Sequence, residues 1–99
     1  MSIPMRATII PSDEFCSVDG VGFVGVEMKN VAADVHAVQW FGSSGEQEIL
    51  DLKTGRIDRN EKIQNLDAFQ NVLNSYWKIR AAHEFAEQEA LNEQTIIEV

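Results

Sequence analysis

The chain contains little of what many functional sites need. Its 99 residues include one cysteine, two histidines and eight basic residues against 16 acidic ones. A single cysteine cannot form an internal disulfide, which excludes a small secreted disulfide scaffold. The eight basic residues are scattered between Arg6 and Arg80, so no cluster can serve as a phosphate-binding surface, and direct binding of nucleic acid is not expected. Cys16 has no basic neighbour in sequence, and we expect it to be a small buried residue without reactivity.

Long apolar runs are also absent. The N-terminal stretch lacks the apolar core of a signal peptide, and no run approaches the ~20 residues that cross a bilayer. We therefore expect no membrane association and a location in the cytoplasm. Apolar residues nevertheless make up 44% of the chain, which is typical of one folded domain.

Up to residue 64 the chain favours short strands separated by turns. We expect strands at 7–10, 15–18, 21–28, 35–41, 46–52 and 56–63. Asp19-Gly20 between two apolar runs indicates a hairpin, because both central residues of a type I′ turn need positive φ. Gly42 to Gly45 is predicted to be a four-residue loop. Residues 1–64 are therefore predicted to form an antiparallel β-meander of five or six strands.

From Asn65, a good N-cap, the pattern becomes helical. The apolar residues of the next turns occupy about half of the helix circumference and should face the sheet; they are Leu66, Phe69, Val72, Leu73, Tyr76, Trp77 and Ile79. Alanines should carry the helix to about Leu91, which gives a helix over 65–91 and a tail over 92–99. Such a helix is about 39 Å long, so its distal half should project from a compact body. The sequence thus predicts an α+β fold, a meander packed against one long C-terminal helix.

The run DGVGFVG matches the dinucleotide fingerprint G-x-G-x-x-G. That motif works only where a strand ends and a helix begins, and here Val and Phe at alternate positions favour a continuing strand. We therefore expect no nucleotide or other cofactor. Gly22 and Gly25 should be bare positions on the strand over which a large ring packs, from Trp40 or Phe41.

The candidate catalytic and metal-binding residues are isolated. His36 and His83 lie in different elements, and Asp34-x-His36 has no third ligand, so no metal site is predicted. Glu46 and Glu48 share one strand face, as the two carboxylates of a glycosidase site do, but such a pair on an exposed strand is usually solvated. We expect no enzyme. A small hydrolase, the remaining enzymatic option, would require a cleft with a perturbed carboxylate or histidine.

The aromatic residues indicate a binding surface. Trp40 and Phe41 are adjacent in a strand, so they face opposite sides and only one of them can enter the core. Phe85 lies on the part of the helix expected to project, where an apolar ring suggests a second chain. The predicted partner-binding residues are Trp40, Phe41, Arg80, His83, Phe85 and Glu87.

The run VAADVHAVQWFGSSGEQEI, from Val31 to Ile49, resembles a pattern in small phage and prophage proteins of the tail-gene region. The upstream SVDGVGFVGVEM, the downstream LDLKTGRIDRNEKI and a helix carrying Trp77 fit the same proteins, so the resemblance covers roughly residues 7–80. Ala32 stands where the pattern has Pro, and Phe41 where it has Tyr. The resemblance implies a tail or tail-fibre accessory or assembly chaperone of the bacterial host cytoplasm or the virion. It implies no catalytic residues, and its partner would be a tail or fibre protein or a second copy.

The net charge of -8 allows another function. Small acidic phage proteins can inhibit a host nucleic-acid-binding protein by imitating the charge of DNA. That role requires carboxylates spaced along one face like phosphates, whereas half of the acidic residues here are scattered over the predicted strands and turns.

Overall fold

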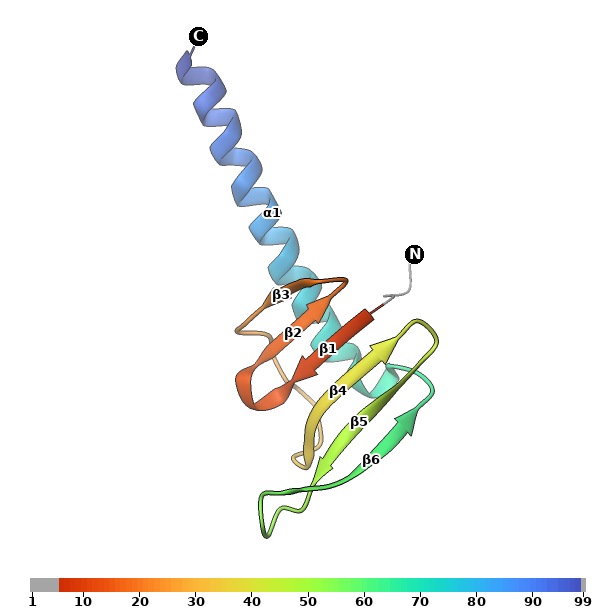
Figure 1. Ribbon diagram of the computed structural model, residues 1–99. Helices are drawn as coiled ribbons and strands as arrows, with labels where there is room; N and C mark the ends of the chain where they lie inside the picture. Colours follow the sequence, from red (N-terminus) through yellow and green to blue (C-terminus); the bar gives the residue numbers. More distant parts are fainter. Residues whose placement is uncertain (1–5, 99) are drawn as a thin grey trace.

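A computed structural model describes the backbone of residues 6–98 and the side chains of residues 6–86 (Figure 1). The described chain forms one antiparallel sheet and one long C-terminal helix, which confirms the α+β prediction. The strands are β1 (Arg6–Ile10), β2 (Phe15–Val18), β3 (Val21–Phe23), β4 (Val35–Phe41), β5 (Ser44–Leu50) and β6 (Ile57–Ile63). The helical segments are the 3₁₀ turns η1 (Pro11–Asp13) and η2 (Asp67–Phe69) and the helix α1 (Gln70–Glu98).

The six strands are ordered β3-β2-β1-β4-β5-β6, and every neighbouring pair is antiparallel. The sheet therefore consists of two three-stranded meanders, and the connection over 24–34 brings β4 back beside β1. This connection runs along α1, where the Glu27 N–H donates to Ser75 Oγ at 3.0 Å. The first strand of the sequence thus lies in the middle of the sheet (Figure 1).

Two hairpins show how glycine fixes the turns. Asp19 and Gly20 have φ of 50° and 85°, as the predicted type I′ turn requires. The second hairpin corrects our prediction of a four-residue loop, because β4 ends at Phe41 and β5 begins at Ser44. A two-residue turn matches the twist of its strands, and Gly42 adopts the positive φ of 67° that it uses.

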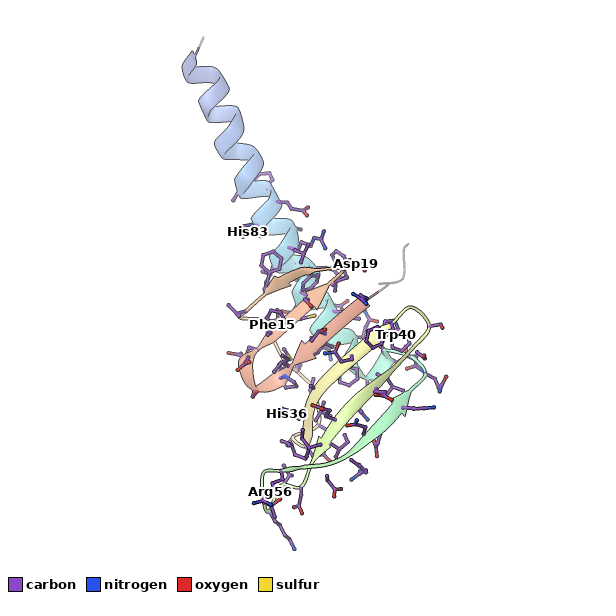
Figure 2. The ribbon with its side chains drawn as sticks, in the orientation of Figure 1. Phe15, Asp19, His36, Trp40, Arg56 and His83 are labelled. Atoms are coloured by element: carbon purple, nitrogen blue, oxygen red, sulfur yellow. The ribbon has the colours of Figure 1, made fainter. Side chains whose placement is uncertain are left out.

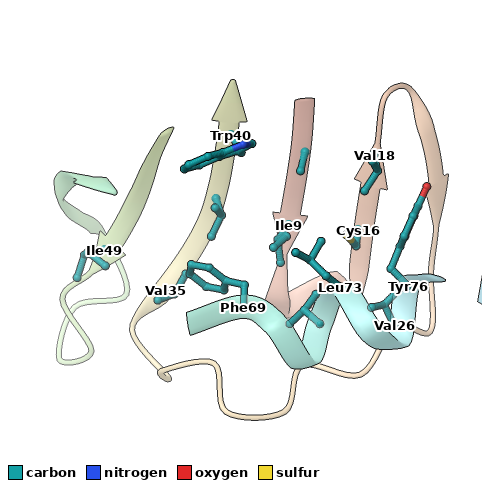
Figure 3. Close-up of a cluster of buried hydrophobic side chains, with 13 residues drawn as sticks. Ile9, Cys16, Val18, Val26, Val35, Trp40, Ile49, Phe69, Leu73 and Tyr76 are labelled. Carbon is teal, nitrogen blue, oxygen red and sulfur yellow. The ribbon is translucent and has the colours of Figure 1, made fainter. Parts of the chain in front are cut away.

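The core lies between the sheet and the first half of α1 (Figure 3). Alternate strand residues face it, including Ile9, Val38 and Trp40, while their neighbours face outward. In β4 the pairing register shifts between Val35 and Ala37, which brings Val35 and Val38 to the same buried side although they are three residues apart.

The helical segment begins later than predicted. Leu66, and not Asn65, is the N-cap residue of the 3₁₀ turn η2, and α1 itself begins at Gln70. Asn65 Oδ1 still accepts a hydrogen bond from the Asp67 N–H at 3.0 Å just before this turn. The buried face of this segment consists of Phe69 in η2 and Val72, Leu73 and Tyr76 in α1. Trp77, which we assigned to this face, is 44% exposed, because at 100° per residue it lies about 40° beyond Leu73, past the edge of the buried face.

The helix also continues to Glu98, beyond the end near 91 and over most of the expected tail. Only its first part packs on the sheet, and the rest projects from it (Figure 1). The molecule measures 62 × 28 × 19 Å and has a radius of gyration of 16.8 Å, against ~13 Å for a compact chain of this size. Within the described residues, no helix is both long enough and apolar enough to cross a membrane.

The glycines of DGVGFVG correct another prediction. A Cβ on Gly22 would lie 2.7 Å from the ring of Phe15, so the ring over this glycine comes from β2. Neither Trp40 nor Phe41 can reach it, because β2 and β1 separate β3 from β4. Gly25 has φ of +81°, a backbone conformation that favours glycine. A Cβ on Gly25 would have no atom within 4 Å, so no ring packs over this position.

Candidate protein-binding surface

One flank of α1 carries a fixed aromatic cluster next to solvent. The Trp77 ring meets the Tyr76 ring edge-on at 5.2 Å, and the Arg80 guanidinium lies over it at 5.2 Å from the centroid. Arg80 Nε also donates to Glu84 Oε1 at 3.2 Å, an i,i+4 ion pair. Trp77 is therefore in contact with both an aromatic ring and a cation.

Tyr76 connects this cluster to the edge of the sheet. Its hydroxyl donates to the Val21 carbonyl at 2.6 Å and accepts from Arg80 Nη1 at 3.3 Å. The hydrogen bonds to Tyr76 and then to Glu84 raise the pKa of Arg80 above its usual value, so the guanidinium stays charged. The direction of α1 relative to β3 is thus fixed by a polar contact as well as by packing.

The predicted residue His83 lies where α1 leaves the sheet (Figure 2). Its ring is 5.3 Å from the ring of Phe23, which is itself 5.8 Å from Tyr76. His83 therefore belongs to the contact between α1 and β3. The side chain of Glu87, another predicted residue, lies outside the described residues.

Phe85 is 64% exposed. Our prediction that it binds a partner required an exposed side chain. Phe85 follows Trp77 by eight positions with Ala81 between them, so the three residues form an i, i+4, i+8 row about 12 Å long. We call this row the aromatic ridge. Rows of this spacing are the ridges that pack into the grooves of a second helix.

The two predicted residues on β4, Trp40 and Phe41, face opposite sides of the sheet as expected, one in the core and one in solvent. Trp40 is only 4% exposed and its Nε1 donates to the Gly42 carbonyl at 3.1 Å, so it is a core residue and its assignment to a binding surface is wrong. Phe41 is 54% exposed, with the Arg6 guanidinium 5.8 Å from its centroid. It lies on the opposite side of the sheet from α1, so the predicted residues do not form one site.

The remaining candidates show ordinary environments. Glu46 lies opposite Lys62 across β5 and β6, beside a shallow hollow of about 540 Å³ next to Phe41. Burial raises the pKa of the Cys16 thiol to about 12, in agreement with an unreactive core cysteine. His36 lines a second hollow of about 270 Å³. The residues that the structure describes include no group of three His, Cys, Asp or Glu that could hold a metal ion.

No protein-family model, no curated protein and no solved structure matches this chain. The resemblance to phage tail proteins therefore stays a prediction. Sequence reasoning missed Trp77 as a surface residue, although one signal was present. Arg80 follows it at i+3, and an arginine beside a tryptophan at that spacing often covers an exposed ring.

Proposed function

We propose that this chain is a non-enzymatic binding protein of phage tail assembly, which engages a tail or tail-fibre protein through the aromatic ridge of α1. The observation that carries the proposal is the projection of a helix with an exposed aromatic row from a small sheet domain (Figure 1). The resemblance over residues 7–80 supplies the class of partner. Assembly of this kind takes place in the cytoplasm of the bacterial host.

The geometry of the ridge suits binding. Trp77 is already held by Tyr76 and Arg80, so little side-chain entropy is lost when a partner covers it. Phe85 gains about 1.5–3 kcal/mol if a partner buries it fully, because it is largely exposed in the free chain. Tryptophan and arginine are also the residues that most often dominate interface energies.

The test is a binding measurement with the tail and tail-fibre proteins encoded beside this chain. We expect one of them to bind, and Phe85→Ala or Trp77→Ala to weaken binding at least tenfold. Alanine keeps the helix intact, which circular dichroism checks. Phe41→Ala is the matched control, because this ring is similarly exposed on the other side of the sheet and its loss should leave the affinity unchanged.

Two outcomes would contradict the proposal. If every neighbouring tail protein fails to bind, the class of partner is wrong. If Phe85→Ala and Trp77→Ala bind as the natural chain does while Phe41→Ala does not, the surface is wrong. Capture of a host polymerase or nuclease instead would favour the acidic inhibitor.

A further inference from the structure

The charges of the edge strand β6 are opposite in sign to those of the same strand read backwards. It reads Ile57, Asp58, Arg59, Asn60, Glu61, Lys62, Ile63, so each acidic residue lies as far from Asn60 as a basic residue does on the other side. The chain as a whole has twice as many acidic as basic residues, yet this strand carries two of each. Its charge pattern is therefore distinct from that of its surroundings.

This strand is at the end of the sheet. It pairs with β5 on one side, and no strand that the structure describes lies on its other side. The helix α1 runs towards β2 and β3 at the other end of the sheet, and the η2 segment before it, with Ala68 and Phe69, comes near Glu61 of β6 (Figure 1). All seven side chains are exposed or half-buried. A free edge of this kind exposes backbone N–H and C=O groups that can pair with another strand.

We propose that β6 pairs antiparallel with β6 of a second copy of this chain, with Asn60 opposite Asn60. β6 pairs regularly with β5 from Arg59 to Ile63, and its register shifts at Asp58. Within the regular part, Arg59 then lies opposite the Glu61 of the other copy, and Asp58 approaches its Lys62 from the β-bulge at the end of the paired segment. Cross-strand pairs of opposite charge stabilise a sheet, and the arrangement closes as a symmetric dimer.

The same charges disfavour other registers of the β6 pair. A slip of one residue brings Arg59 opposite Lys62 in one direction and Asp58 opposite Glu61 in the other. A slip of two residues brings Glu61 opposite Glu61 or Arg59 opposite Arg59, and an in-register parallel pairing puts every charge opposite itself. Like charges that face each other across strands are destabilising. Charges of one sign would simply block the edge, whereas this order favours the register centred on Asn60 over the antiparallel registers one or two residues away.

The geometry of the fold accommodates this dimer. The two-fold axis of an antiparallel strand pair is perpendicular to the sheet, so both copies of α1 lie on the same face and at opposite ends of the joined sheet. Arg59 contacts Asp58 at 2.8 Å and Glu61 at 2.9 Å within its own strand, and in the dimer it exchanges this Glu61 for the one of the other copy. The aromatic ridge remains free, so the dimer is independent of the proposed function.

Disulfide trapping tests the register. Opposite residues of an antiparallel pair have Cα atoms about 4.5–5.5 Å apart, within disulfide range. We expect Asn60→Cys to form a covalent dimer quickly under mild oxidation, and Lys62→Cys to do so at least tenfold more slowly, because those two thiols would be roughly 13 Å apart. The natural Cys16 is fully buried and does not interfere. Equal rates for the two variants would overturn the register.

Charge reversal tests the interface in solution. Sedimentation should give the full chain a mass of about twice 11.1 kDa. Arg59→Glu converts two attractive pairs into two repulsive ones, and we expect dimerisation to weaken roughly tenfold or more. Adding Glu61→Arg restores opposite charges and should restore the dimer. A natural chain that stays monomeric at high concentration, or a double variant no better than Arg59→Glu while both remain folded, would overturn the proposal.

Discussion

Replacement of Tyr76 by Phe removes one oxygen atom from the contact that joins α1 to the sheet. The ring stays in the core, where Tyr76 is fully buried, so packing against Phe23 and Trp77 is preserved. Two hydrogen bonds are lost, the 2.6 Å bond donated to the Val21 carbonyl and the 3.3 Å bond accepted from Arg80. The substitution therefore isolates the polar part of this junction.

The magnitude follows from those two bonds. A typical hydrogen bond contributes about 0.5–1.5 kcal/mol net, and the longer bond from Arg80 should contribute at the low end. We expect Tyr76→Phe to lower the free energy of unfolding by about 1–2 kcal/mol. Tyr76→Ala also removes the ring from the core and should cost about 3–5 kcal/mol. The difference between the two variants measures the packing of the ring.

Urea unfolding followed by circular dichroism is the assay, at one low protein concentration so that association does not alter the midpoint. The Tyr76→Phe midpoint should fall by roughly 0.5–1.5 M with the slope unchanged. Phe85→Ala serves as the control and should change stability by less than about 0.5 kcal/mol, because Phe85 is exposed. A Tyr76→Phe midpoint equal to that of the natural chain would refute the reasoning.

Three other changes test the core and its glycines by the same unfolding measurement. Gly45→Ala should destabilise by about 2 kcal/mol or more, because its Cβ would meet the backbone carbonyl of Gln39, which cannot move aside. Gly22→Ala meets only the movable ring of Phe15 and should cost less than about 1 kcal/mol; a larger loss than at Gly45 would contradict this explanation. The pKa of Cys16 is raised from 9.0 to about 12 in the folded chain, so stability should be full below pH 9 and fall as pH rises towards 12, by up to about 1.4 kcal/mol per pH unit. Cys16→Ala should remove that slope, and an equal slope in both proteins would show that the thiol is not responsible.

Much of the local structure followed from the sequence because it depends on neighbouring residues. Asp19-Gly20 can form few turns other than type I′, and the amphipathic run after Asn65 indicates a helix, although the N-cap residue is Leu66 and α1 begins at Gln70. The alternation in β4 also implied that Trp40 and Phe41 face opposite sides. Which of the two enters the core depends on the face that α1 covers, and that is a contact between segments far apart in the chain.

The candidate surface was only partly accessible to sequence reasoning. Phe85 was predicted from helix length alone, since a helix longer than its body must expose its distal residues. Trp77 was wrongly predicted to face the sheet. The apolar residues of the helix occupy about half of its circumference, and the sheet covers a narrower part of it. The free edge at β6 could not be predicted either, because the place of each strand in the sheet follows from the return of β4 to β1.

The sequence by itself determined the order of strands and helix, the Asp19-Gly20 turn and the self-complementary charge order of β6, because these depend on residue type and spacing. Tertiary structure alone decided that Trp40 is buried, that Phe15 covers Gly22, and that β6 lies on a free edge. Each of those depends on which strands become neighbours and on where one helix crosses them. Such contacts join distant segments, and no local periodicity encodes them.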